Sequence, residues 1–72
     1  MTVRLLSPKG ARQSKRMTQA EAAALTGITL DTIRKIERRS ERGEAVKVAR
    51  RTWERLCDAY GVQELAGIEV RA

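Results

Sequence analysis

The chain has 72 residues, which suffices for one domain with one small core. Its 15 Lys and Arg residues exceed its 9 Asp and Glu residues, and the net charge of +6 favours a polyanionic partner, either nucleic acid or a membrane surface. A solvated surface explains the same charge. No window approaches the roughly 18 apolar residues of a membrane span, and a chain with one cysteine and no histidine forms no internal disulfide and offers no ordinary zinc site.

The N-terminal part predicts a short strand followed by a weak helix. Thr2–Leu6 alternates between apolar and polar residues, as half-buried strands do. Ser7 can then cap a helix whose first residue is Pro8, because proline at that position loses no hydrogen bond. Gly10 weakens this helix over 8–15, so we expect it to depend on packing.

A stronger helix follows Thr18. The spacing of Thr18 and Glu21 is that of a capping box, in which each side chain satisfies the other residue's backbone N–H. The helix continues through an alanine-rich stretch and ends at Gly27, since glycine readily adopts the left-handed conformation of a helix C-cap.

The next helix begins almost at once. Thr29 can cap it, and we expect it to run to about Arg39 with Ile33 and Ile36 facing inward. The opposite face carries Leu30, Asp31, Arg34, Lys35 and Arg38.

The second half of the chain predicts one long helix. Residues from Ser40 to about Lys47 form a polar link, and an amphipathic closing helix is expected over about 48–60. Its apolar stripe is formed by Trp53, Leu56, Cys57 and Tyr60. Beyond Gly67, Ile68–Arg71 alternates like a strand, and we expect it to pair with Thr2–Leu6 in a small sheet, within or between subunits.

The informative unit is the helix pair over 18–38. Two short helices joined by so tight a turn must cross at a large angle. Ala23 is small enough for close crossing, Gly27 suits the turn, and Ile33 is a branched apolar anchor on the second helix. Those residues at those spacings, after a capping box, are a specific signal of a helix-turn-helix.

The sequence resembles the Cro and phage-repressor class of helix-turn-helix regulators. The resemblance covers about residues 8–66. Its matching residues are Thr18-Gln19-Ala20-Glu21, Ala23, Gly27-Ile28-Thr29, Thr32-Ile33, Ile36-Glu37, Leu56 and Tyr60-Gly61-Val62. It implies an all-α, compact, lambda-repressor-like domain of four to five helices that occupies 1–72 and places its third helix in the major groove of DNA.

The resemblance also implies roles for individual residues. Base-contact candidates are Thr29, Leu30, Asp31, Arg34 and Lys35, and phosphate-contact candidates are Gln19, Thr18, Arg38, Arg39, Arg42 and Lys47. It further implies an ion pair between Glu37 and Arg12. Asp31 and Lys35 also have the spacing of a helical i,i+4 pair, which can open when DNA arrives. The link after Glu37 is longer than in compact members of the class, and for Arg42 and Lys47 an ordinary mobile loop is an equal alternative to phosphate contact.

Three positions depart from the family pattern. Ala22 stands where leucine is usual, Thr26 where an aliphatic residue is usual, and Leu25 at a normally polar position. Two explanations stay open at this point: the helix is slightly rotated, or Leu25 meets a partner subunit.

No group of residues suggests catalysis. Cys57 has no histidine to activate it, and its helical spacing places it in the core. Trp53 and Tyr60 lie on the apolar stripe, which favours core or dimer interface over base stacking. Glu41 and Glu44 lie in a basic link without an apolar setting. We therefore expect no enzymatic activity, no cofactor and no metal.

The predicted function is that of a sequence-specific transcription regulator in the cytoplasm of a bacterial or phage-infected cell, associated with the nucleoid. We expect a homodimer on double-stranded DNA, joined around Tyr60 to Val70, and no membrane contact. One alternative is an antitoxin that binds a toxin protein and represses its own operon. Another is a phage structural or accessory module that makes protein contacts without DNA specificity. RNA binding lacks stacking aromatics on the basic face.

Overall fold

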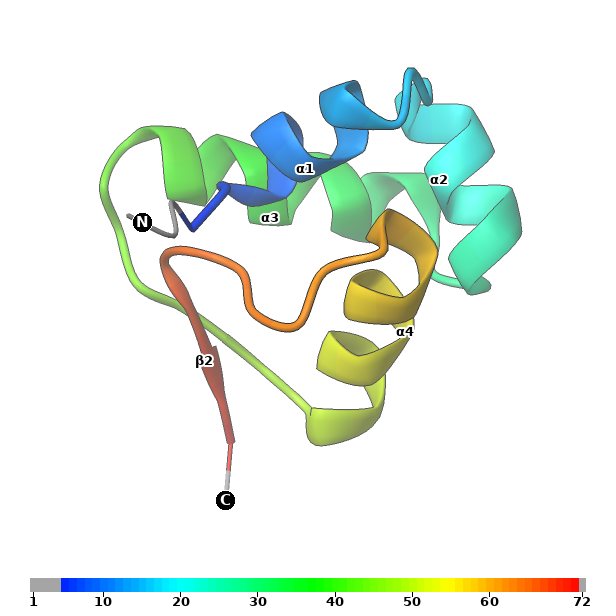
Figure 1. Cartoon of the computed structure of the whole chain (residues 1–72). Helices are drawn as coiled ribbons and strands as arrows, with labels where there is room; N and C mark the ends of the chain where they lie inside the picture. The colour runs from blue at the N-terminus through cyan, green and yellow to red at the C-terminus, as the bar shows by residue number, and fades with distance from the viewer. Residues whose placement is uncertain (1–4, 72) are drawn as a thin grey trace.

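The computed structural model describes residues 5–71. Within them the chain forms four helices and a two-stranded sheet. In order these are α1 (Pro8–Ser14), α2 (Gln19–Thr26), α3 (Leu30–Glu41), β1 (Val46–Val48), α4 (Arg50–Tyr60) and β2 (Ile68–Val70). α1 crosses in front of α3, with α2 and α4 at one end of the pair and β2 near the other (Figure 1). The predicted compact helix-turn-helix fold of four to five helices is confirmed, with four helices among the described residues.

α1 forms as the sequence predicts and buries more than expected. The Ser7 hydroxyl accepts a hydrogen bond from the Gly10 N–H at 3.1 Å, and Pro8 begins the helix. Ala11 is fully buried, and so is most of Arg12. After the helix the chain turns sharply through Arg16, a non-glycine residue with φ of 56°.

The capping box at the start of α2 is present in full. The Thr18 hydroxyl accepts from the Glu21 N–H at 3.0 Å, and the Glu21 carboxylate accepts from the Thr18 N–H at 2.9 Å. Gly27 ends the helix in the left-handed conformation, with φ of 74°. A short turn then leads to Thr29, which caps α3 in the same way.

This capping box predicts a defined pH dependence. The backbone N–H of Thr18, and then its side chain, lower the pKa of Glu21 from its ordinary value near 4.5. The stabilisation is therefore fully present at neutral pH and is lost as the pH falls through the lowered, folded-state pKa. Glu21→Gln is expected to lose stability at neutral pH and to decline less steeply in acid. Thermal unfolding of both proteins across the acid range measures this, and parallel curves would contradict it.

Of the three residues of α2 that depart from the family pattern, two face the core and one faces outward. Ala22 is fully buried and Thr26 is 6% exposed, whereas Leu25 is 63% exposed. The Thr26 hydroxyl donates to the Ala22 carbonyl at 2.7 Å and accepts from the Ile28 N–H at 3.1 Å, so its burial leaves no polar atom unsatisfied. The helix is therefore not rotated, and Leu25 simply points outward.

α3 ends two residues beyond the predicted Arg39, at Glu41. Ile33 and Ile36 are buried, as expected, and Glu37 is buried with them on the inner face. The inner face of α3 thus contacts the core, and its outer face is free.

The sheet differs from the prediction. β1 lies within and just beyond the link from Ser40 to Lys47, which the sequence predicted to be irregular. It pairs in parallel with β2, so that Val46 lies opposite Ile68. The expected partner was Thr2–Leu6: its residues 2–4 lie outside the described part of the chain, and Leu5 and Leu6 are in no strand. The physical reason is burial, because Val46 and Val48 face the core from β1.

α4 begins two residues later than predicted and ends, as predicted, at Tyr60. Tyr60 is only 1% exposed, so it belongs to the core and to no surface that could bind another molecule. Trp53 is half-buried against the same core. The core is formed by Ala11, Ala22, Ile33, Ile36, Val46, Val48, Leu56, Cys57, Tyr60 and Leu65.

Candidate nucleic-acid interface

The outer face of α3 carries a row of charged side chains. Most of its predicted base-contact and phosphate-contact residues are exposed: Asp31, Arg34, Lys35, Arg38 and Arg39. Leu30 is half-buried at the start of the helix. The inner face packs on the core, so these outer side chains remain accessible to another molecule.

Asp31 and Lys35 form the i,i+4 ion pair that the spacing suggested. Lys35 Nζ lies 3.3 Å from an Asp31 carboxylate oxygen, and both side chains are well exposed, at 65% and 75%. An exposed pair of this kind contributes only about 0.2–0.5 kcal/mol. Opening it to contact a base edge would therefore cost little.

The two predicted threonine contacts serve as helix caps. The Thr29 hydroxyl accepts from the Thr32 N–H at 3.2 Å and donates to the Thr32 hydroxyl at 2.8 Å, which uses its hydrogen bonds locally. The Thr18 hydroxyl accepts from the Glu21 N–H, and among the described residues its own O–H has no acceptor. Of the two, Thr18 is the better placed to donate to a phosphate.

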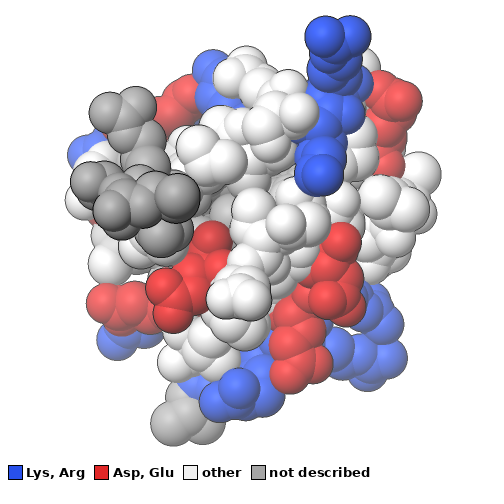
Figure 2. Space-filling model, in the orientation of Figure 1, with Lys and Arg blue, Asp and Glu red and all other residues white. Residues whose placement is uncertain are grey.

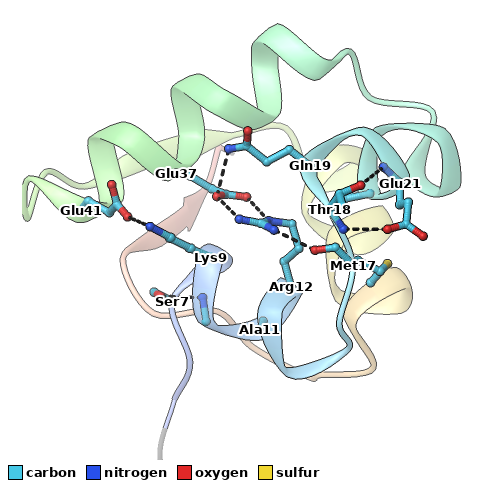
Figure 3. Close-up of polar contacts among 12 residues, drawn as sticks. Ser7, Lys9, Ala11, Arg12, Met17, Thr18, Gln19, Glu21, Glu37 and Glu41 are labelled. Carbon is cyan, nitrogen blue, oxygen red and sulfur yellow. Dashed lines mark hydrogen bonds and ion pairs between the residues drawn. The ribbon is translucent and has the colours of Figure 1, made fainter.

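A buried ion pair fixes α1 against α3. Arg12 Nε and Nη2 donate to the two Glu37 carboxylate oxygens at 2.8 and 2.9 Å, and Arg12 Nη1 donates to the Met17 carbonyl at 2.7 Å (Figure 3). This is the pair that the family resemblance implied. The hydrogen bond to Glu37 raises the pKa of the Arg12 guanidinium. One side chain thereby joins α1, the segment before α2, and α3.

Gln19 is held by the same group. Its side-chain amide donates to a Glu37 oxygen at 3.2 Å from the first residue of α2 (Figure 3). A surface hollow of about 440 Å³ opens beside it, lined in part by Lys9, Arg34 and Arg38. The structure thus brings Gln19 together with two predicted DNA contacts of α3. Lys9, which pairs with Glu41 at 2.8 Å, joins them without having been predicted.

A second hollow, of about 210 Å³, lies on another flank of α3. Lys35 and Arg39 line it from α3, and Lys47 from β1. Two residues that sequence reasoning missed complete it: Thr52 in the first turn of α4, and Arg71 just after β2. The alternation of Ile68–Arg71 signalled the strand, but only its true partner, β1, shows that Arg71 lies beside α3.

The structure distinguishes Arg42 from Lys47, the two residues of the link for which phosphate contact and a mobile loop were equal alternatives. Lys47 is part of β1 and lines the second hollow, so it lies in regular structure and not in a mobile loop. Arg42 is the C-cap of α3, is exposed, and lines neither hollow. The case for phosphate contact is therefore stronger for Lys47 than for Arg42.

The face opposite α3 has a different character. Figure 2 shows the side on which α1 and α4 lie in front, with uncharged side chains across its centre, acidic side chains below them, and basic side chains along the lower edge and at the upper right. Among residues 5–71 no helix is long and apolar enough to cross a bilayer. The same residues contain no group of three His, Cys, Asp or Glu side chains placed to hold a metal ion.

Comparison with known proteins agrees with this geometry. A family model described as a helix-turn-helix domain matches residues 9–66, which includes all four helices except the first residue of α1. No curated protein and no solved structure matched the chain. Helix-turn-helix domains dock their second helix, here α3, in the major groove of DNA. The chain belongs to the helix-turn-helix domain family.

Proposed function

We propose that the protein is a sequence-specific transcription regulator of the phage-repressor or Cro type, which reads double-stranded DNA through α3. The observation that supports this most strongly is the outer face of α3. It is exposed and basic, and a hollow that contains predicted phosphate contacts lies on each of two flanks. Ile33, Ile36 and Glu37 are buried on the inner face, so the packing of the core fixes the position of the helix.

The chemistry of the outer face suits base readout. Arg34 and Lys35 can donate to guanine O6 and N7, Asp31 can accept from cytosine N4, and Leu30 can pack on a thymine methyl group. Gln19, at the start of α2, is placed for a backbone phosphate, with its amide already oriented by Glu37.

One module offers few base contacts, so we propose that two copies related by a two-fold axis read a near-palindromic operator. The half-sites would then lie one helical turn apart, about 34 Å. We place the contact between copies in the segment after Tyr60, where Ile68 and Val70 are half-buried. Tyr60 itself is excluded by its burial. Sedimentation of the free protein and of its DNA complex measures this stoichiometry.

The test of DNA reading starts from a pool of randomised duplexes. Purified protein selects from the pool, the selected duplexes are sequenced, and affinity for the best site is followed against salt. Recovery of a near-palindromic sequence is the expected result. A steep salt dependence without an enriched sequence would leave only non-specific phosphate binding and would overturn the proposal.

Two variants test whether side chains of α3 contact the DNA bases. Arg34→Ala and Lys35→Ala are each expected to weaken binding to the selected site about tenfold, because a good bidentate base contact discriminates by about 1–3 kcal/mol. Each should also relax the sequence preference at one position. Lys15→Ala is the matched control, since it removes the same charge from a side chain that lies against Gly61, at the far end of α4. An equal loss in all three variants would show that only net charge matters.

One observation favours a second candidate function. Leu25 is exposed and, with Met17, Glu21 and Ala24, lines a mainly apolar hollow on α2. An exposed apolar surface of this kind suits a protein partner, as in an antitoxin that also represses its own operon. Because such an antitoxin also binds its operator, DNA selection does not separate the two candidates; under the second, Leu25→Ser should weaken binding of a protein partner and leave the selected DNA sequence unchanged.

A further inference from the structure

The hollow between α3, β1, the start of α4 and Arg71 concentrates positive charge. Lys35, Arg39, Lys47 and Arg71 line it, and no acidic residue does. Of these four cations, Lys35 pairs with the exposed Asp31, and no ion pair of Arg39, Lys47 or Arg71 is found among the described residues. Glu69 is the cross-strand neighbour of Lys47 but does not line the hollow. Four cations around about 210 Å³ repel one another, and a bound anion would relieve that repulsion.

Neutral donors surround the same space. The hydroxyl groups of Thr32 and Thr52 belong to residues that line it, as does Ala49, the N-cap of α4. Ala49 provides no side-chain cap, so the helix end adds backbone N–H groups to the charge that the four side chains supply. Cations, hydroxyl groups and backbone N–H groups are together the donors that bind phosphate oxygens in protein–DNA complexes.

The position of the hollow favours the DNA backbone as the source of the phosphate. It lies beside Lys35 and Arg39, whereas the hollow with Gln19 lies beside Arg34 and Arg38. A helix in the major groove, which is about 12 Å wide, has a phosphate backbone on either side. With α3 in the groove, each of the two hollows would face one of these backbones.

We propose that this hollow binds a phosphate group of the DNA backbone, with Lys47 and Arg71 as its added cations. The proposal rests on the proposed function, because it takes α3 as the helix in the groove. It gives the small sheet a role: parallel pairing of β1 with β2 brings a lysine and an arginine from distant parts of the chain to one side of α3. The DNA interface then extends beyond the helix-turn-helix unit.

The first arm of the test uses a short duplex of mixed sequence and the variants Lys47→Gln, Arg71→Gln and Lys15→Gln. Each of the first two is expected to weaken binding equally on all sequences and to reduce the slope of log affinity against log salt by about 0.9. Lys15→Gln, which removes the same charge at the far end of α4, should leave the slope unchanged. Thermal unfolding of each variant checks that the fold is retained, as expected for substitutions of exposed side chains.

The second arm separates DNA from a free anion. Backbone amide shifts of Lys47 and Thr52 are followed by NMR while inorganic phosphate or the duplex is added. The expected result is a shift with the duplex at concentrations far below those at which inorganic phosphate acts. Saturation by inorganic phosphate alone, with no response to the duplex, would overturn the assignment to the DNA backbone.

Failure of this proposal is distinct from failure of the proposed function. If Lys47→Gln and Arg71→Gln behave like Lys15→Gln while Arg34→Ala and Lys35→Ala still weaken binding, the hollow is not a phosphate site although α3 reads DNA. If the unaltered protein binds no duplex at any salt concentration, the proposed function itself is overturned.

Discussion

Replacing Glu37 by alanine is expected to lower the free energy of unfolding by about 3–5 kcal/mol, because it leaves the buried Arg12 guanidinium without its partner. The side chains of the pair are only 10% and 5% exposed, and two short hydrogen bonds join them. Gln19 would lose its acceptor at the same time. A domain of this size has a total stability of only about 5–15 kcal/mol, so the variant should be largely unfolded at modest urea concentrations.

A double variant separates the cost of the unpaired charge from the value of the pair. Arg12→Met combined with Glu37→Leu removes both charges and keeps the approximate volume, so it should recover much of the stability lost by Glu37→Ala. Equilibrium urea unfolding, followed by circular dichroism, measures all three proteins. A Glu37→Ala variant as stable as the parent would show that Arg12 finds water or another acceptor. The ion pair would then not be what holds α1 against α3.

Leu56→Ala is expected to cost about 2–5 kcal/mol, since the leucine is 1% exposed and its removal leaves a cavity in the core. Leu56 belongs to α4 and lies in the cluster that also contains Ile33 of α3 and Val48 of β1. The small core has few residues to collapse into the space, so we expect little relief by repacking. The measurement is again equilibrium unfolding in urea.

Leu25→Ala provides the matched control, because the same atoms are removed from a side chain that is 63% exposed. The expected change is within about 0.5 kcal/mol of zero for the isolated chain. Equal losses in the two variants would mean that Leu25 is buried in solution, and a dependence of the Leu25→Ala effect on protein concentration would point to a contact between copies.

The sequence predicted the helix-turn-helix unit well, because its signals are local. Thr18 and Glu21 lie within one helical turn, Gly27 ends the helix by its own backbone preference, and Thr29 caps the next helix. Residues that must satisfy one another across three or four positions leave a pattern that can be recognised without knowing the tertiary structure.

The sheet could not be predicted in the same way. β1 has only three residues, and the alternation of Val46, Lys47 and Val48 is too short to stand out from a polar link. Its partner, Ile68–Val70, comes after α4 in the sequence. Parallel strands are not joined by a tight turn, so no turn residues mark the pairing. The place of Arg71 beside α3 follows from that pairing alone, which is why sequence reasoning did not include it among the candidate contacts.

The hydrogen bonds between β1 and β2 also allow the closure of the chain around α4 to be measured. Parallel strands need a long crossover, and here α4 and the segment up to Gly67 supply it. The Val46 N–H donates to the Gly67 carbonyl at 2.9 Å, and the Arg71 N–H to the Val48 carbonyl at 2.8 Å. Both bonds join the segment before α4 to the segment after it, so they close the crossover. Hydrogen–deuterium exchange at the two amides therefore reports how often that closure opens, independently of the helices' own exchange.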